Sequence, residues 1–419
     1  MQSTSTIRIL CLLALTAAAH ASGFALKDGD RVVFYGDSIT DQRLYTTFTE
    51  TYVVTRFPKL DVSFVHSGWG GDRVTGGGGG SIDTRLRRDV FAYKPTVMTI
   101  MLGMNDGSYK AFDEKIFDTY AKGYQRIIDS VKKELPGIRI TVIQPSPYDD
   151  VTQPAKFEGG YNAVLLRYSE FVKELAQKEK LGVADLNVPV VAALEKAKAT
   201  DAEQAKKIIP DRVHPGASGH LLMAAELLKS WQAPALVSGV EIDAKAKKVI
   251  VAKGTRVSDL KTSDAISWTQ LDEALPMPVD LKDPVMALAV ESSDFVQTLN
   301  QQTLKVTGLG AASYGLKIDD DEVGSFTSEQ LGQGINLAIL PTPMVKQAAQ
   351  VHKLTLQHNN MHFQRWRQVQ VPLEKNESAR VQKAVKDLMT ALDDDEAEVV
   401  KQQRAAAQPG RHQFSLIPK

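Results

Sequence analysis

The feature that most constrains this chain is a regular alternation of short apolar runs and longer amphipathic stretches over residues 23–231. The apolar runs are continuous, as in strands that are buried on both faces of a sheet. They are Arg31–Tyr35, Val62–His66, Val97–Leu102, Arg139–Ile143 and Val183–Leu186. Helical periodicity follows at Gln42–Phe57, Ile82–Phe91, Lys115–Glu134, Leu165–Lys180, Val190–Lys198 and His220–Trp231. This alternation predicts an α/β domain with a parallel sheet that is covered by helices on both faces.

The chain changes character at about residue 234. Short alternating runs separated by turns predict a small antiparallel β-sandwich. These runs are Val240–Ile242, Lys248–Val251, Ala265–Leu271, Thr303–Thr307, Tyr314–Ile318 and Val323–Phe326. Residues 343–407 have a helical pattern with a break expected near Val371-Pro372, and His412–Ile417 is expected to return as a strand. We therefore predict two units, residues 22–233 and residues 234–419, the second being a β-rich module that carries a helical hairpin.

Residues 1–21 have the pattern of a secretory signal peptide. One charged residue, Arg8, precedes an apolar run from Ile9 to Ala19, and Ala19-His20-Ala21 forms a small-x-small cleavage site. The run is too short to span a membrane, and we expect no membrane span elsewhere. A buried N-terminal helix is the alternative. We expect an exported protein, periplasmic or extracellular, whose mature chain has no thiol because the only cysteine, Cys11, lies in this segment.

Charge and composition exclude several classes of partner. Lysine and arginine total 50, as do aspartate and glutamate, and a balanced chain lacks the basic stripe that a nucleic-acid binder needs.

The acidic run Asp393–Glu396 lacks the spaced ligands and the glycine of a calcium loop. His358 and His362 are four residues apart but lack the glutamate of a zinc-binding H-E-x-x-H motif. We expect neither a metal nor an organic cofactor.

Two short motifs contain a candidate nucleophile and a candidate base. Ser38, in Gly36-Asp37-Ser38-Ile39-Thr40, directly follows the first predicted strand, where open α/β sheets bind ligands. Its alternative role is to cap the next helix. Asp211 precedes His214 by three residues, so its carboxylate can accept from Nδ1–H and leave Nε2 free to take a proton from a serine.

Two further motifs contain candidate hydrogen-bond donors. Asn105, in Gly103-Met104-Asn105-Asp106, follows the strand at residues 97–102 and can direct its side-chain N–H₂ at a developing oxyanion. An Asn-Asp turn is the alternative. The segment Gly68-Trp69-Gly70-Gly71-Asp72 follows the strand that ends near His66, and its glycines let the backbone approach a ligand closely. A plain glycine-rich turn is the alternative.

The order Ser, Gly, Asn, His of these motifs resembles the SGNH (GDSL-like) hydrolase family, whose blocks are GDS, a glycine, GxND and DxxH. The resemblance covers roughly residues 29–231 and implies a three-layer, flavodoxin-like fold and a serine esterase. It implies that Ser38 is the nucleophile, that His214 is the general base and later the acid, and that Asp211 orients His214. The nucleophile elbow G-x-S-x-G is absent from the chain, which argues against an α/β-hydrolase.

The resemblance also implies an oxyanion hole made of the backbone N–H groups of Ser38 and Gly71 and the side chain of Asn105. Gly70 is the alternative to Gly71. One departure is His66, which stands where many relatives have asparagine. The five consecutive glycines at residues 76–80 do not form a phosphate-binding motif, and we expect a flexible loop beside the oxyanion glycine.

The predicted substrate is a small-molecule or glycan ester, preferably an acetyl ester on a carbohydrate. Trp69, Tyr109 and Tyr148 follow predicted strands near the site, where aromatic faces stack on sugar rings, although ordinary packing explains them equally well. Export and the appended β-module agree with a glycan-acting enzyme by analogy only. The alternatives are a lipid or aryl esterase, a thioesterase, or a glycan-binding or scaffolding protein with a relict hydrolase domain.

Overall fold

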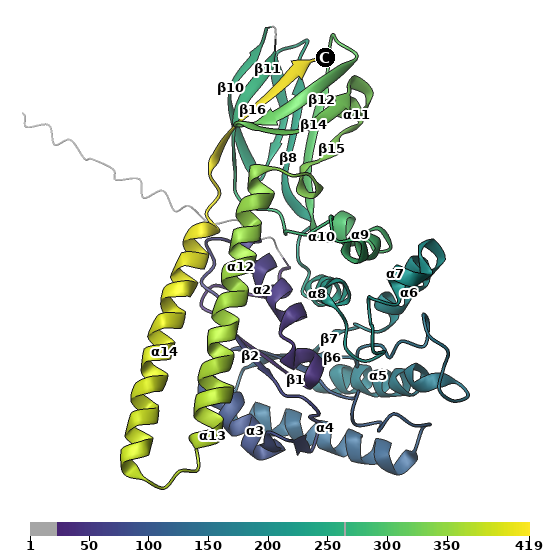
Figure 1. Cartoon of the computed structure of the whole chain (residues 1–419), viewed down its shortest axis with the longest axis vertical. Coiled ribbons are helices and arrows are strands. Elements are labelled where there is room, and N and C mark those ends of the chain that lie inside the picture. Colours follow the sequence, from purple (N-terminus) through teal and green to yellow (C-terminus); the bar gives the residue numbers. More distant parts are fainter. Residues whose placement is uncertain (1–22, 264) are drawn as a thin grey trace, which may run out of the picture.

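Three parts make up the described chain, which comprises residues 23–263 and 265–419 of this computed structural model. A layered α/β domain is followed by a β-sandwich, and a long two-helix hairpin runs from the sandwich along the side of the α/β domain (Figure 1). The signal-peptide prediction for residues 1–21, and Cys11 with it, fall outside the described residues. Within the described residues, no helix combines the length and the apolar character that crossing a membrane requires.

The α/β domain is built on a five-stranded parallel sheet in the order β2-β1-β5-β6-β7. Its strands are β1 (Arg31–Gly36), β2 (Ser63–Gly68), β5 (Val97–Met101), β6 (Arg139–Ile143) and β7 (Gly182–Ala184). The predicted strands agree with these bounds to within about two residues. Gly36 at the end of β1 pairs with Gly68 of β2 and with Met101 of β5. The carboxyl ends of these three strands therefore lie level, at one edge of the sheet.

Helices cover both faces of this sheet, as predicted. Figure 1 shows α3, α4 and α5 on one face, and α2 and α8 on the other. The helices are α1 (Ser38–Asp41), α2 (Leu44–Arg56), α3 (Ile82–Asp89), α4 (Glu114–Glu134), α5 (Gly160–Glu179), α6 (Val188–Thr200), α7 (Ala202–Ala205) and α8 (Ala217–Ser230). Asp113 begins α4 by accepting from two N–H groups of its first turn. Tyr124 then attaches α4 to β5, because its hydroxyl donates to the Ile100 carbonyl at 3.0 Å.

The C-terminal module contains two sheets that pack as a sandwich, in the orders β10-β11-β16-β13-β14 and β15-β12-β8-β9. Its strands are β8 (Leu236–Asp243), β9 (Lys248–Lys253), β10 (Thr255–Thr262), β11 (Ile266–Asp272), β12 (Gln301–Thr307), β13 (Ser313–Ile318), β14 (Asp321–Thr327), β15 (Ile335–Asn336) and β16 (Arg411–Pro418). The predicted return of residues 412–417 as a strand is confirmed by β16. Trp268 and Phe414 stack between the sheets with ring centroids 5.1 Å apart.

The prediction of an antiparallel sandwich needs one correction, because β12 runs parallel to β8. Three short helices, α9 (Pro284–Glu291), α10 (Phe295–Leu299) and α11 (Ser328–Gln333), interrupt the strands. The first two lie between β11 and β12 and return the chain to the start of β8, where Gln301 N–H donates to the Ala235 carbonyl at 2.9 Å. Because β12 starts beside the beginning of β8, the two strands run in the same direction.

The helical hairpin comprises residues 343–406. It consists of α12 (Pro343–Phe363), a π-helical segment (Gln364–Gln370), α13 (Val371–Leu373) and α14 (Ala379–Ala406). The break that the sequence predicts near Val371-Pro372 instead lies at residues 374–378. The reason is that Pro372 sits in the first turn of α13, where a missing N–H is tolerated.

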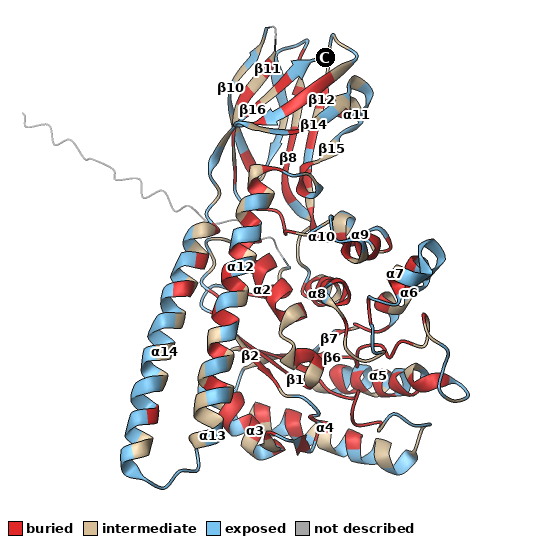
Figure 2. Cartoon of the chain, in the orientation of Figure 1, coloured by how far each residue is buried: buried red, intermediate tan, exposed pale blue. Residues whose placement is uncertain are grey.

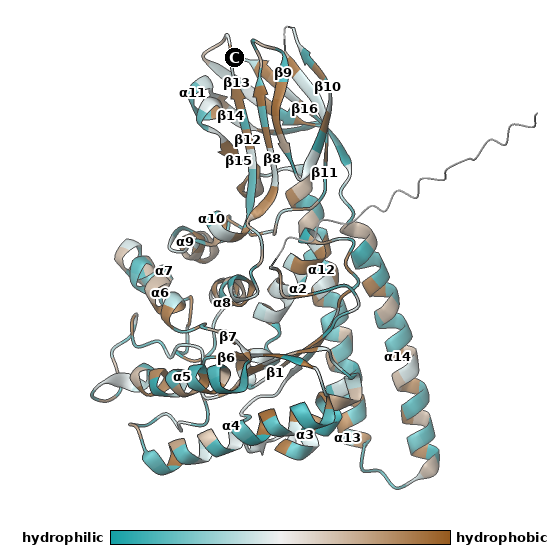
Figure 3. Cartoon of the chain, turned by 180° about the vertical axis from the view of Figure 1, so that it is seen from behind, coloured by the Kyte–Doolittle hydropathy of each residue, from teal (hydrophilic) through white to brown (hydrophobic). Residues whose placement is uncertain are grey.

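The hairpin packs on the α/β domain, and not only on the β-rich module to which its sequence position assigned it. Most of α14 is exposed, whereas buried residues of α12 face α2 (Figure 2). The contact includes several buried hydrogen bonds. Glu50 of α2 accepts from His358 Nε2 at 2.6 Å and from Gln403 Nε2 at 2.9 Å, and Asn359 Nδ2 donates to Thr47 Oγ1 at 2.9 Å. Figure 3 shows hydrophobic colour in the strands of both units and in bands on the helices, whereas most of α14 is hydrophilic.

Candidate active site

Ser38 stands at the carboxyl edge of the sheet, where β1 ends and α1 begins. Asp37 caps this short helix by accepting from the Ile39 N–H at 3.0 Å. Burial, together with the nearby charges of Asp106 and Asp72, raises the pKa of Asp37 to about 7. Ser38 is the first residue of α1, so its N–H has no preceding helical turn to bond, and its side chain is partly exposed. The local structure therefore presents one hydroxyl and one N–H at this edge.

His214 lies in the loop before α8, with one ring nitrogen facing each of its two partners. Its Nε2 is 2.9 Å from Ser38 Oγ, and its Nδ1 is 2.7 Å from Asp211 Oδ2. A carboxylate only accepts, so Nδ1 carries the proton and Nε2 is left to accept from the serine hydroxyl. Asp211 Oδ1 also accepts from the N–H groups of Val213 and His214, at 2.9 and 2.7 Å. These bonds close a tight turn that fixes the imidazole.

The carboxylate of Asp211 stays ionised in this turn. Burial alone would raise its pKa, but the hydrogen bonds from the His214 backbone and side chain and from the Val213 N–H hold the pKa below its ordinary value. The Asp211 side chain is 58% exposed and the His214 side chain 36% exposed. Asp211, His214 and the partly exposed Ser38 thus lie at an open surface.

Asn105 follows β5, and two hydrogen bonds fix its amide. Its Nδ2 donates to the Asp72 carbonyl at 3.1 Å, and its Oδ1 accepts from the Tyr109 hydroxyl at 2.8 Å. An amide nitrogen has two hydrogens, so one remains for another acceptor. The next residue, Asp106, accepts from the Val74 N–H at 3.0 Å and so attaches the chain after Asp72 to the same strand end.

Residues 68–72, which we call the glycine loop, offer two candidate oxyanion donors. The N–H of Gly70 is occupied, because it donates to Asp41 Oδ2 at 3.1 Å. The N–H of Gly71 has no acceptor among the residues that the structure describes. Gly71 also has a φ of +78°, a conformation that favours glycine. The geometry favours Gly71 over Gly70 as the donor.

The five glycines at residues 76–80 are not a flexible loop, as the sequence had suggested. They form a tight hairpin of β3 (Gly76–Gly77) and β4 (Gly80–Ser81) that packs on the glycine loop. A Cβ atom on residue 77 would come within 2.7 Å of Asp72, and one on residue 79 within 2.5 Å of the Trp69 ring. Glycine is required at these positions because the neighbouring residues leave no space for a side chain, and not because the segment has to be flexible.

The three aromatic residues predicted to contact substrate differ in what they expose. Tyr109 is 41% exposed and lies beside Asn105. Tyr148 is only 2% exposed, and the ring of Trp69 is covered by the guanidinium of Arg367, which lies 3.5 Å from its centroid. The expectation is therefore corrected for Tyr148, which is buried, while Trp69 is partly exposed with Arg367 over its ring and Tyr109 is the most exposed of the three.

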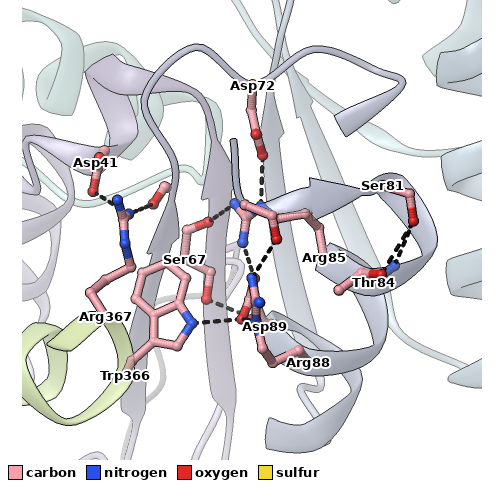
Figure 4. Close-up of polar contacts among 12 residues, drawn as sticks. Asp41, Ser67, Asp72, Ser81, Thr84, Arg85, Arg88, Asp89, Trp366 and Arg367 are labelled. Atoms are coloured by element: carbon pink, nitrogen blue, oxygen red, sulfur yellow. Dashed lines mark hydrogen bonds and ion pairs between the residues drawn. The ribbon is translucent and has the colours of Figure 1, made fainter. Parts of the chain in front are cut away.

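A buried charge cluster behind the glycine loop, which the sequence did not predict, is shown in Figure 4. The guanidinium of Arg85 is fully buried and donates to Asp72 Oδ2 and to the Ser67 carbonyl, each at 2.7 Å, and to Asp89. From the hairpin, Trp366 Nε1 donates to Asp89 Oδ1 at 2.6 Å. No local pattern could reveal this last contact, because its partners are 277 positions apart.

Two histidines outside the site, His66 and His358, take part in the docking of the hairpin. His66 is buried, with Nδ1 2.6 Å from Thr46 Oγ1 and Nε2 3.2 Å from Glu50 Oε2. His358, which the sequence placed in a packing or surface role, bonds the other oxygen of Glu50. Across the described residues, no group of three or more histidine, cysteine, aspartate and glutamate side chains is arranged to hold a metal ion.

The chain is similar to several known proteins. A family model of the GDSL-like Lipase/Acylhydrolase family matches residues 34–222. The solved structure of a gut microbial diltiazem-metabolizing enzyme is similar to 94% of this chain over 98% of its own, with 29% identity and a TM-score of 0.79. An acetylxylan esterase from Geobacillus stearothermophilus is 25% identical over 228 residues, which are 48% of this chain and 93% of that protein. The chain therefore contains a domain of the GDSL-like lipase/acylhydrolase family and is an ester-hydrolysing hydrolase.

Proposed function

We propose that this chain is an exported serine esterase in which Ser38, His214 and Asp211 act as a catalytic triad. The observation that carries the proposal is a pair of hydrogen bonds, from Ser38 Oγ to His214 Nε2 at 2.9 Å and from His214 Nδ1 to Asp211 Oδ2 at 2.7 Å. This is the arrangement that activates a serine hydroxyl for attack on a carbonyl. The proposal of export rests on the signal-peptide pattern of residues 1–21.

The geometry supports an acyl-enzyme mechanism. His214 Nε2 accepts the hydroxyl proton as Ser38 Oγ attacks the ester carbonyl carbon, and Asp211 stabilises the imidazolium that forms. The N–H groups of Ser38 and Gly71 and the remaining Nδ2 hydrogen of Asn105 donate to the oxyanion, each accelerating the step by about 10²–10³-fold. His214 then gives the proton to the leaving alcohol oxygen as its bond to carbon breaks. Water repeats the sequence and releases the acid.

The substrate that we propose is an acetyl ester on a carbohydrate. One relative is an acetylxylan esterase, which is aligned over nearly its whole length. The exposed His214 and Asp211 leave room for a bulky alcohol part to approach. The exposed ring of Tyr109 next to Asn105 offers a face for a sugar. The β-sandwich adds support by fold-level analogy alone.

A second candidate is an esterase for small aryl or drug-like esters. One solved structure that resembles nearly the whole chain, with the hairpin and the sandwich included, is named for metabolizing diltiazem. A lipid esterase or thioesterase has no comparable observation in its favour. A binding protein with a relict hydrolase domain is disfavoured by the intact contacts of Ser38 with His214.

Acetate release separates these candidates. The mature chain is assayed on acetylated xylan, other acetylated polysaccharides and oligosaccharides, diltiazem, and p-nitrophenyl esters of increasing acyl length, with Ser38→Ala as control. We expect acetate release from at least one carbohydrate, activity on p-nitrophenyl esters confined to short acyl groups, and loss of both in Ser38→Ala. Turnover of diltiazem without carbohydrate deacetylation would favour the second candidate. A preference for C8 or longer chains would remove the carbohydrate assignment, and a folded chain that a phosphonate probe does not label at Ser38 would favour a binding role.

A further inference from the structure

The hairpin reaches the candidate site through its π-helical segment at residues 364–370. This segment lies at the end of α12 that is remote from the β-sandwich (Figure 1). π-Helical turns are rare and often occur at functional positions. The Trp366 side chain is 1% exposed and the Arg367 side chain 17% exposed, and both point into the α/β domain (Figure 4). Arg365 instead pairs with Asp393 of α14, at 2.8 Å.

Arg367 contacts the glycine loop from one side. Its Nη1 donates to the Gly68 carbonyl at 3.4 Å and to Asp41 Oδ1 at 3.1 Å. The second oxygen of Asp41 accepts from the Gly70 N–H at 3.1 Å. The guanidinium carbon also lies 3.5 Å from the centroid of the Trp69 ring, a cation–π contact. One side chain of the hairpin is thus connected to three consecutive residues of the loop.

Trp366 contacts the other end of the loop through the buried charge cluster (Figure 4). Its Nε1 donates to Asp89, which is bonded to Arg85, and Arg85 Nε donates to Asp72 Oδ2 at 2.7 Å. The carbonyl of Asp72 in turn accepts from Asn105 Nδ2. The chain of contacts that starts at Trp366 therefore reaches Asp72 and the amide of Asn105. These two residues flank the proposed oxyanion site.

We propose that the hairpin is part of the active site, with Arg367 as a positioning residue that holds the glycine loop so that the Gly71 N–H faces the oxyanion. This inference rests on the proposed function. Three of the five residues of the loop are glycines, which restrict the backbone little and offer no side chain to pack. Oxyanion donors stabilise the transition state only when they are fixed in advance. The support has to come from outside the loop, and Arg367 supplies it.

Two alanine variants in the same segment separate positioning from simple docking of the hairpin. Arg367→Ala removes the contacts to the loop, whereas Arg365→Ala removes an ion pair within the hairpin and serves as the matched control. We expect Arg367→Ala to lower kcat roughly 10- to 100-fold with KM almost unchanged. The rate at which a phosphonate probe labels Ser38 should fall by a similar factor. Arg365→Ala should keep both rates near those of the wild-type chain.

Two further variants keep the test decisive if Arg367→Ala folds poorly. Arg367→Lys retains the cation but not the planar fork, so it should lose less than the alanine variant. Asp41→Asn keeps an oxygen for the Gly70 N–H but loses the charge that pairs with Arg367. A double variant combines Arg367→Ala with Asp41→Asn. If Arg367 acts through Asp41, the fold-loss in kcat of this double variant should be well below the product of the fold-losses of the two single variants. Thermal denaturation of every variant shows whether the fold is retained.

Each outcome bears on one proposal or on both. A wild-type chain that is not labelled at Ser38 overturns the proposed function and this inference with it. Normal labelling of the wild-type chain, with Arg367→Ala reacting as fast as Arg365→Ala, overturns this inference alone. A change confined to KM would also overturn it, because such a change indicates a direct contact with the substrate. Multiplicative losses in the double variant would show that Asp41 does not transmit the effect.

Discussion

Replacing Glu50 with glutamine should loosen the hairpin from the α/β domain. The carboxylate of Glu50 is 2% exposed and accepts from three buried nitrogens, those of His358 at 2.6 Å, Gln403 at 2.9 Å and His66 at 3.2 Å. Glutamine has nearly the same shape, but its N–H₂ group would face donors, and the positive charge of His358 would lose its closest counter-charge. Only Glu396, at 3.4 Å, would still pair with His358.

The magnitude follows from the burial of this pair. Removing one partner of a buried ion pair costs about 3–5 kcal/mol, because the other charge is left uncompensated. For a cooperative unit of roughly 200 residues, each kcal/mol lowers Tm by about 2–4 °C. Glu396→Gln is the matched control, since the Glu396 side chain is 17% exposed and its contact with His358 is longer. We expect the control to lose less than half as much stability.

The effect should also depend on pH. Burial alone would lower the pKa of His358, but the charges and hydrogen bonds of Glu50 and Glu396 raise it to about 9. A histidine with a raised pKa stabilises the folded state fully below its unfolded pKa of about 6.5, and that stabilisation is lost as pH rises through about 9. His358 and His66 hold the pKa of Glu50 below its ordinary value against the opposing effect of burial, so its contribution is lost only in acid. The difference between wild type and Glu50→Gln should therefore be largest near pH 6 and shrink above pH 9.

Thermal denaturation between pH 5 and pH 10, with hydrogen exchange of α12 and α14, measures both effects. Exchange in the hairpin should rise in Glu50→Gln before the central sheet is affected, because the lost contacts lie between α2 and the hairpin. Equal stabilities for Glu50→Gln and Glu396→Gln would refute the reasoning. So would a wild-type advantage that grows, instead of shrinking, as the pH passes 9.

Three further predictions concern the site. Asn105→Ala should lower kcat by about 10²–10³-fold with KM nearly unchanged, and equal changes in kcat and KM would contradict the oxyanion role. Tyr109→Phe should lower kcat less, because it removes only the hydrogen bond that orients the Asn105 amide. Asp211→Asn should lower kcat by about 10²–10⁴-fold, since the amide does not stabilise the imidazolium, and an unchanged pH–rate profile would argue against it. Gly68→Ala should abolish soluble expression, because the added Cβ atom would collide with the backbone of α1. In Gly71→Ala the added Cβ atom meets no atom within 4 Å, so this variant should lose only about 1–2 kcal/mol of stability through backbone strain. Thermal denaturation measures this loss.

The parallel sheet and its site motifs could be predicted because their signals are local. Each strand of the sheet is a continuous apolar run, and the polar groups that follow parallel strands meet at one edge whatever the register. Ser38 and His214 are 176 positions apart, yet each is placed by its own short motif, one at a strand end and the other before a helix. Their approach to 2.9 Å therefore needs no long-range information beyond the order of the elements.

The parts that the sequence did not reveal depend on which distant side chains come to lie next to each other. The glycines at residues 76–80 indicated flexibility by composition, but the neighbouring Trp69 and Asp72 leave no space for a side chain there. The position of Trp69 after a strand is equally consistent with sugar stacking and with ordinary packing, and the sequence does not reveal that Arg367 from the hairpin lies over its ring. The break in the hairpin was misplaced because Pro372 starts a helix as readily as it ends one.

The position of β16 couples the C-terminal half of the chain to the active site. β16 follows the hairpin in sequence, yet it lies between β11 and β13, at the centre of its sheet. The chain therefore returns to the sandwich only after passing through both helices, whose near ends lie together, where Gln347 Nε2 donates to the Ala406 carbonyl at 2.8 Å. The far end of α12 leads into Trp366 and Arg367, which contact the glycine loop. A chain that ends before residue 343 lacks the central strand and the support of the loop at once, so it should lose activity beyond what its stability alone would explain.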